Sequence, residues 1–148
     1  MNTVLLVEDN RLIKIAHERL LTRAGYKVVA AGDGEEALKV VHSVSPDVIL
    51  LDMMLPRVSG HQVLRALKSN PLTAGIPVVV VTGLSKMNAG KLKGDGANAF
   101  VEKEALLDSL QPLLDAIRHV LKKTAVARKS AVLIGTAEPR LALSGFER

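Results

Sequence analysis

The stretch that decides the fold spans residues 48–60 and reads Val48-Ile-Leu-Leu-Asp52-Met-Met-Leu-Pro56-Arg-Val-Ser-Gly60. Its first four residues are apolar without alternation, which is typical of a strand buried on both faces of a parallel sheet. Ser59 and Gln62 have the spacing of a capping box, which predicts that a helix begins there. The stretch therefore predicts a buried strand that ends at an acid, a loop and a helix.

Strands and helices alternate in both directions from this stretch. Further β-prone runs lie at 4–7, 27–31, 78–81 and 99–101. Helical patterns separate them: one over 11–24 that should stop at Gly25, one that follows Asp33 and Glu36, and a weaker one over 85–94. A last helix should begin near 108–111 and include residues up to 121, because Pro112 is tolerated only in a first turn.

This order predicts an α/β fold, a doubly wound five-stranded parallel sheet with strand order 2-1-3-4-5, as in flavodoxin. We expect one domain over residues 1–122. Residues 122–148 carry six basic and two acidic residues, whereas residues 1–121 carry 14 and 13. We therefore expect residues 123–148 to form a basic tail that is partly disordered or packed on a partner.

Composition excludes several classes of function. The chain has no cysteine, which removes disulfides, thiolate zinc sites and cysteine nucleophiles. It has only three aromatic residues, Tyr26, Phe100 and Phe146, too few to stack the bases of single-stranded nucleic acid. No apolar stretch approaches 18 residues, so we expect no membrane span and a cytoplasmic protein.

Polar side chains stand where four of the five strands end. They are Glu8 and Asp9, Asp52, Thr82 and Lys103. In doubly wound sheets the carboxyl ends of the strands form one ligand-binding edge. Clustered carboxylates repel one another unless a cation holds them, and a few oxygen ligands suit Mg²⁺. Beside that ion Asp52 would act as a nucleophile toward phosphorus, with Thr82 and Lys103 holding the remaining phosphoryl oxygens.

Four motifs carry a resemblance to a known family. They are Val7-Glu8-Asp9-Asn10, Asp52-Met-Met-Leu-Pro56-Arg-Val-Ser-Gly60, Val81-Thr82-Gly83 and Phe100-Val-Glu-Lys103. Together they resemble the receiver domain of bacterial two-component response regulators, over about residues 2–121. The resemblance implies a single-domain regulator, not a conventional enzyme. Asp52 would accept a phosphoryl group from a sensor histidine kinase or a histidine phosphotransfer protein.

The resemblance also implies a role for each site residue. Mg²⁺ would be held by Glu8, Asp9, Asp52 and the Met54 carbonyl. The phosphoryl group would be contacted by Thr82, Lys103 and the backbone N–H groups of Met53 and Gly83. The switch would be formed by Thr82 and Phe100. No other cofactor is implied. The output would be a downstream protein target, and a homodimer would use the face of the helix over 85–94, the strand over 99–101 and the last helix.

Several positions depart from the family or bear on its partners. Glu104 replaces the usual proline after Lys103, and we predict a trans bond between them. Gly83 replaces a small residue that has a side chain. Met54 and Leu84 are apolar where side chains flank the attacking water, so we expect slow autodephosphorylation. Leu12 and Ile15 are spaced to lie either on a surface that docks a helical bundle or in the core.

Alternatives remain at this point. The chain would otherwise be a phosphorylation-independent binding module or the receiver fragment of a hybrid kinase. A remote alternative is a dinucleotide-binding module, because Gly32-Asp-Gly34-Glu-Glu-Ala37 matches G-x-G-x-x-A. The three acidic residues of this motif, Asp33, Glu35 and Glu36, would repel the negative charge of a pyrophosphate. We expect nucleic acid to bind only through the basic tail, and the four histidines to be structural or solvated.

Overall fold

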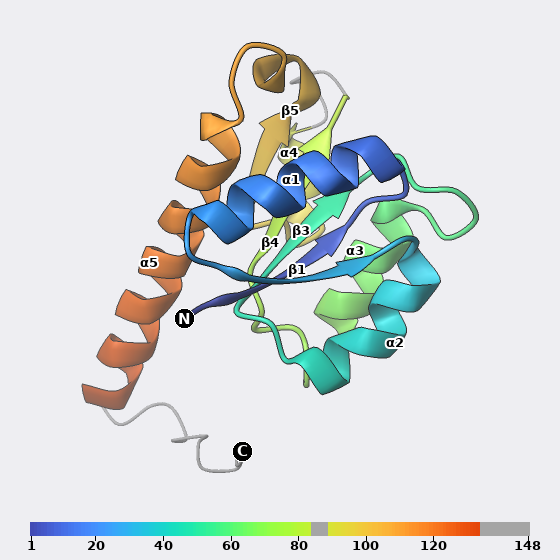
Figure 1. The fold of residues 1–148 in the computed structure, drawn as a ribbon. Helices are drawn as coiled ribbons and strands as arrows, with labels where there is room; N and C mark the ends of the chain where they lie inside the picture. The colour runs from blue at the N-terminus through green and yellow to red at the C-terminus, as the bar shows by residue number, and fades with distance from the viewer. Residues whose placement is uncertain (84–88, 134–148) are drawn as a thin grey trace.

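The computed structural model describes residues 1–83 and 89–133 as a three-layer α/β domain (Figure 1). Its sheet has five parallel strands in the order β2-β1-β3-β4-β5. Their bounds are Thr3–Val7 for β1, Lys27–Ala31 for β2, Val48–Asp52 for β3, Val78–Thr82 for β4 and Ala99–Glu102 for β5. The fold class, the strand order and the positions of all five strands confirm the sequence-based prediction.

Burial explains why three of the runs are apolar without alternation. Every residue of β3 and β4 is buried, and so are the last four residues of β1. These strands lie inside the sheet with helices on both sides, so neither face meets water. The register pairs Val7 with Leu51 and Asp52 with Val81, which brings the carboxyl ends of β1, β3 and β4 level with one another.

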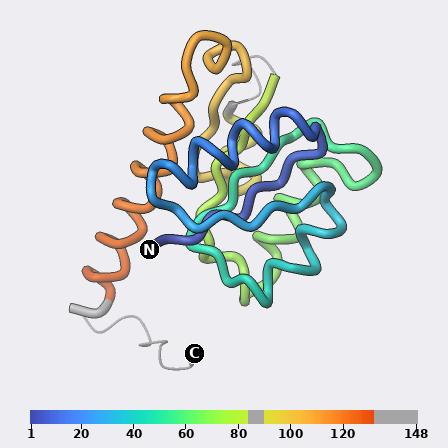
Figure 2. Tube along the Cα trace, in the orientation of Figure 1, coloured from blue at the N-terminus to red at the C-terminus, as the bar shows by residue number. Residues whose placement is uncertain are grey.

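Two groups of helices cover the sheet (Figures 1 and 2). The helices α2 (Gly34–Val44), α3 (Gly60–Ser69) and α4 (Ala89–Gly94) pack on one face, where the core includes Ala37, Val63 and Leu92. The helices α1 (Arg11–Arg23) and α5 (Gln111–Leu133) pack on the other face, where the core includes Leu21, Leu113 and Ile117. The sheet is therefore sealed on both sides, and the open edge at its carboxyl ends is left for a site.

The predicted helix ends are confirmed by their hydrogen bonds. Ser59 and Gln62 form the expected capping box at α3, with both reciprocal bonds present. Asp33 caps α2 by accepting from the Glu36 N–H, while the Glu36 carboxylate accepts from the Gly32 N–H. After α1 the chain turns at Gly25, whose φ of 100° is the left-handed conformation that favours glycine.

The C-terminal third differs from the prediction in three details. Helix α4 begins at Ala89, and the first residues of the expected segment, 85–88, lie outside the described residues. A short 3₁₀ helix, η2 (Lys103–Leu106), follows β5 and was not predicted. Helix α5 begins at Gln111 with Pro112 in its first turn, as predicted, but runs on to Leu133. The proposed boundary between a domain and a tail at residue 122 stays a prediction.

Within residues 1–83 and 89–133, no helix combines the length and the apolar character that crossing a bilayer requires.

Candidate functional site

The strand ends place the predicted site residues along one edge of the sheet. Glu8 and Asp9 follow β1, Asp52 ends β3, Thr82 ends β4 and Lys103 follows β5. Since β1, β3, β4 and β5 are consecutive in the sheet, these residues lie in that order across its carboxyl edge. The expected gathering of these residues at one edge is therefore present in the fold, and the carboxylates and the amine of Lys103 are close together there.

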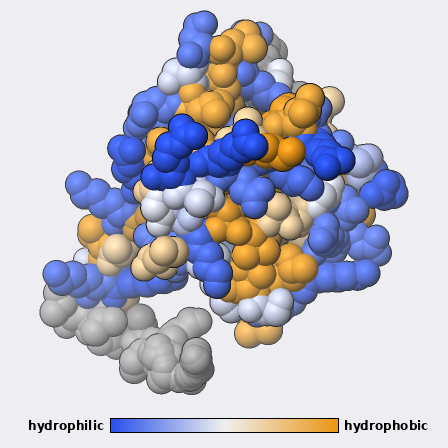
Figure 3. All heavy atoms as spheres, viewed as in Figure 1, coloured by the Kyte–Doolittle hydropathy of each residue, from blue (hydrophilic) through white to orange (hydrophobic). Residues whose placement is uncertain are grey.

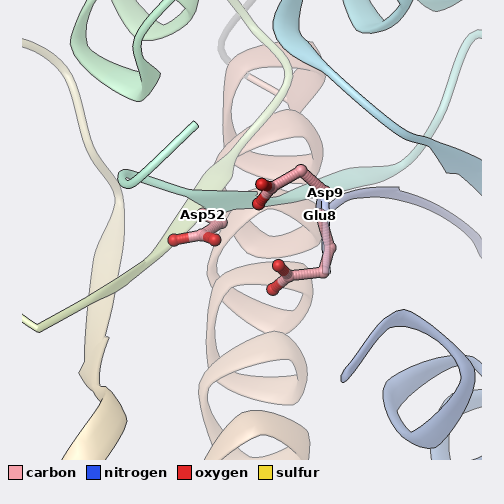
Figure 4. Close-up of side chains that lie close together, drawn as sticks. All are labelled: Glu8, Asp9 and Asp52. Atoms are coloured by element: carbon pink, nitrogen blue, oxygen red, sulfur yellow. The ribbon is translucent and has the colours of Figure 1, made fainter. Parts of the chain in front are cut away.

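The three carboxylates form a tight cluster. One oxygen each of Glu8, Asp9 and Asp52 lies within 4.8 Å of the others. Figure 4 shows the three side chains pointing toward one another, two from the end of β1 and one from β3. Asp52 and Glu8 are each only 3% exposed, whereas Asp9 is exposed. Water therefore reaches the cluster on the Asp9 side.

The environment of Glu8 disfavours its charge. Burial raises the pKa of Glu8 from 4.5 to about 7, and the neighbouring charge of Asp52 contributes to that rise. A hydrogen bond from the Asn10 N–H to Glu8 Oε2, at 3.1 Å, opposes that shift. The backbone of Glu8 is fixed as well, because its N–H donates to the Ala31 carbonyl at 3.1 Å. The protein thus holds a carboxyl group in place without supplying enough positive charge to keep it ionised.

Two donors fix the orientation of Asp52. The Met54 N–H donates to Asp52 Oδ1 at 3.0 Å, and Lys103 Nζ lies 3.2 Å from the same oxygen. The ammonium group thus reaches across from β5 to β3, past the end of β4. A nearly buried carboxylate that is held by an amide and an amine at one oxygen is in a defined position for reaction at the other.

The two amides after Asp52 have different partners. The N–H of Met53 continues the ladder of the sheet and donates to the Val81 carbonyl at 3.0 Å, whereas the N–H of Met54 faces Asp52. The role expected for the Met53 N–H stays a prediction. The sequence could not distinguish these two amides, because the length of the ladder beyond Asp52 depends on the neighbouring strand. The Met54 side chain is 62% exposed at the same edge.

Thr82, Gly83 and Phe100 occupy the β4 and β5 side of the site. Thr82 is buried and lies opposite Glu102 in the register. Gly83 is exposed, and a Cβ added there would meet no atom within 4 Å, so the site has room for the side chain that the family usually carries. Phe100 is partly exposed in β5, opposite Val80. Leu84 lies outside the described residues.

The bond between Lys103 and Glu104 is trans, as predicted, like every peptide bond of the described residues. Lys103 also begins η2, so the chain turns into a short helix directly after the amine that reaches Asp52.

His17 is buried on the inner side of α1, one turn before Leu21, which agrees with the expectation of a structural histidine. Burial lowers the pKa of His17, the charge of Asp52 acts against that effect, and Lys103 adds to it. Its spacing to Leu21, four residues on the same helix face, is the pattern that would have placed it inside.

The glycine motif of the remote alternative has a packing explanation. A Cβ on Gly34 would lie 2.6 Å from Val63 Cγ2 and 2.9 Å from the Val58 carbonyl, so glycine is needed where α2 meets α3. The helix N-terminus that would bind a pyrophosphate is already capped by the Asp33 carboxylate. This arrangement is opposed to a dinucleotide site.

Comparison with known proteins agrees with this geometry. The family model for the response regulator receiver domain matches residues 4–118. Among its relatives, the response regulator MprA of Mycolicibacterium vanbaalenii is 34% identical over 122 residues, which are 82% of this chain and 51% of that protein. The polar-differentiation response regulator DivK of Brucella anthropi is 34% identical over 102 residues, which are 68% of this chain and 83% of that protein.

Solved structures show the same fold. A CheY-like receiver domain protein from Methanospirillum hungatei superposes with a TM-score of 0.76 at 24% identity, covering 86% of this chain and 98% of that one. A response regulator from Chloroflexus aurantiacus gives 0.74 at 27% identity, covering 82% and 98%. The chain spans about half the length of MprA and similar relatives. With strand order, clustered carboxylates and the matched span in agreement, the chain belongs to the receiver domain family of two-component response regulators.

Proposed function

We propose that the protein is a response regulator that is phosphorylated on Asp52 and signals through a surface that this modification changes. The observation that carries the proposal is the setting of Asp52. Its carboxylate is almost fully buried, shares a cluster with Glu8 and Asp9, and is held at one oxygen by the Met54 N–H and Lys103 Nζ. A surface or capping acid needs no such set of partners.

The reaction is an in-line phosphoryl transfer. The second oxygen of Asp52, Oδ2, attacks phosphorus, the bond from phosphorus to the donor's imidazole nitrogen breaks, and that nitrogen takes the electron pair. Lys103 and the hydroxyl of Thr82 would contact the phosphoryl oxygens, together with the N–H groups of Met54 and Gly83. The chain thus acts as a phosphoacceptor whose own site assists the transfer, and not as an enzyme with a separate substrate.

The donor set fits Mg²⁺. Two buried carboxyl groups and one exposed one, within 4.8 Å of each other, supply hard oxygen ligands and leave room for water. Burial, and to a lesser degree the charge of Asp52, raises the pKa of Glu8, and a bound cation would oppose that rise. Glu8, Asp9, Asp52 and the Met54 carbonyl would hold the ion, which when bound supplies charge neutralisation for the incoming phosphoryl group.

The histidine kinase or histidine phosphotransfer protein would dock at α1. Leu12 is 79% exposed beside the site, which supports the docking interpretation over a core position, and Ile15 is half-buried on a shallow hollow. Figure 3 shows an apolar patch at the N-terminal end of α1 beside a hydrophilic band. An apolar anchor with a polar surround suits a helical partner.

The output would come from the face of α4, β5 and α5. Phosphorylation would draw Thr82 toward the new phosphoryl group and let Phe100 turn inward, a shift between two populated states. Phe100 and Leu107 are exposed apolar side chains on this side, which would be recognised by a protein target or a second copy of the chain.

Intact-mass spectrometry after incubation with acetyl phosphate tests the proposal. We expect one phosphoryl adduct that requires Mg²⁺ and is absent in Asp52→Asn. Asp108→Asn, at an exposed turn outside the site, is the matched control and should keep the adduct. A folded protein that gives no adduct, also with a phosphohistidine donor, would instead be a phosphorylation-independent binding module.

A further inference from the structure

The loop between β3 and α3, residues 53–59, is closed tightly at its base. The Gly60 N–H donates to the Met53 carbonyl at 3.3 Å. A Cβ on Gly60 would lie 2.4 Å from Met53 Cα and 2.7 Å from the Asp52 carbonyl oxygen, so only glycine fits there. The two ends of the loop therefore touch directly beside Met54, whose N–H faces the Asp52 carboxylate.

The middle of this loop is tied to α2 by an ion pair. Arg57 Nη2 donates to Asp33 Oδ2 at 3.0 Å. Arg57 adopts a φ of 60°, a left-handed conformation that is unfavourable for a residue with a Cβ. Next to it, the Val58 carbonyl packs where a Cβ of Gly34 would lie. The loop is thus held against the beginning of α2 by a charged pair and by a close backbone approach.

Asp33 itself belongs to the frame that carries the acids after β1. Its other oxygen, Oδ1, accepts from the Glu36 N–H at 2.8 Å and caps α2. The preceding strand β2 pairs with β1, opposing Ala31 to Val7, and the Glu8 N–H donates to the Ala31 carbonyl. Asp33 is therefore two residues beyond the point where the backbone of Glu8 is fixed.

We propose that Arg57 and Asp33 are positioning residues for the phosphoacceptor site. The pair links the β1 and β2 side, which holds Glu8 and Asp9, to the loop that presents the Met54 N–H and carbonyl. The sheet already fixes Asp52 relative to Glu8, but the loop lies outside the sheet and needs its own tie. This inference rests on the proposed function, since it assigns Met54 a role toward the ion and the phosphoryl group.

The expected effect is modest, because the Arg57 side chain is 68% exposed and that of Asp33 30%. Exposed ion pairs contribute little, and water and salt screen them. Loss of the pair should therefore weaken Mg²⁺ binding by about two- to fivefold, and the effect should shrink at high salt.

Three variants separate positioning from simpler effects. Arg57→Gly removes the guanidinium group and suits a φ of 60° better than arginine does, so the fold is retained. Asp33→Asn removes the charge and keeps an oxygen that caps α2. The third is the double variant. Glu35→Gln and Lys39→Gln are matched controls, because they remove the same charges from an exposed pair 4.0 Å apart on α2 that includes neither Arg57 nor Asp33.

Two measurements are made on each variant: Mg²⁺ affinity by calorimetry, and hydrogen exchange of the Met54 and Gly60 amides in the metal-free protein. We expect both single variants to weaken Mg²⁺ binding and to speed exchange of these two amides, with the amides of β3 unchanged. The double variant should bind Mg²⁺ no more weakly than the single variant with the lower affinity, because both substitutions remove the same interaction. The controls should behave as wild type.

The directions in which the two single variants change Mg²⁺ affinity distinguish positioning from a purely electrostatic effect. Loss of the positive Arg57 through the field alone would tighten Mg²⁺ binding, whereas loss of the negative Asp33 would weaken it. Opposite shifts, additive effects or unchanged exchange at Met54 would overturn the positioning role. If wild type itself forms no Mg²⁺-dependent adduct, the proposed function fails; if wild type forms it and the variants match wild type, only this inference fails.

Discussion

Replacing Glu8 with glutamine should stabilise the metal-free protein, and the gain should grow with pH. Burial raises the pKa of Glu8 in the folded protein to about 7, against 4.5 for an exposed carboxyl group. Between these values the folded state binds a proton that the unfolded state has released. The free energy of unfolding of the wild type therefore falls as pH rises through this window.

The size of the effect follows from the two pKa values. A difference of one pKa unit corresponds to about 1.4 kcal/mol. The destabilisation by Glu8 is then about 1 kcal/mol at pH 5, because that pH lies only slightly above the pKa of 4.5 in the unfolded chain, and about 3 kcal/mol at pH 8. Glutamine carries no charge and keeps an oxygen for the Asn10 N–H, so Glu8→Gln removes this penalty.

Urea denaturation followed by circular dichroism, with a chelator present, measures the difference between variant and wild type at each pH. Glu104→Gln, at an exposed position outside the cluster, is the matched control. Added Mg²⁺ should stabilise the wild type more than the variant at pH 8, because the ion supplies the missing positive charge. A stability difference that stays constant from pH 5 to 8 would refute the conclusion that burial holds a proton on Glu8.

Four other outcomes are expected. Leu12→Ser should slow phosphorylation by a phosphohistidine donor and leave phosphorylation by acetyl phosphate unchanged, because Leu12 is exposed on α1; equal rates with both donors would remove it from the docking surface. Gly60→Ala should destabilise the fold by about 1–3 kcal/mol in a thermal melt, whereas Gly90→Ala, which meets no atom within 4 Å, should not. Met54→Asn combined with Leu84→Glu should shorten the lifetime of phosphorylated Asp52 severalfold, since apolar side chains cannot orient a hydrolytic water; an unaltered half-life counts against this. Truncation before Thr124 should leave the adduct intact, and loss of salt-dependent retention on DNA would assign the basic residues there to nucleic acid.

The fold was predictable because each element carries its own local evidence. The unbroken apolar runs of β1, β3 and β4 require a sheet covered on both faces, and Ser59 and Asp33 mark helix starts by the hydrogen bonds that they make in the folded chain. The residues at the strand ends could also be predicted as a site, because parallel strands bring their carboxyl ends together whatever the conformation of the loops.

The remaining details depend on contacts between segments far apart in the chain. Whether Met53 or Met54 turns its N–H to Asp52 is decided by the Val81 carbonyl on the next strand. The hydrogen bond between Arg57 and Asp33 joins residues that are 24 positions apart in the chain, and neither side chain shows from the sequence which residue it will bind. The residue type alone left His17 as either structural or solvated, and its spacing to Leu21 places it on the buried face.

The C-terminal part of α5 extends beyond the packed core of the domain. From Lys122 to Leu133 the helix extends about 17 Å, at 1.5 Å per residue, beyond the turn that contains Val120, the last deeply buried side chain among those whose burial is described (Figure 1). Its base packs on β5, the strand that holds Phe100 and leads into Lys103. A tilt of about 10° at that base would carry the tip sideways by about 3 Å, if the helix moves as one rigid rod. Under the proposed switch, a rearrangement of Phe100 would thereby become a displacement of the C-terminal end of α5.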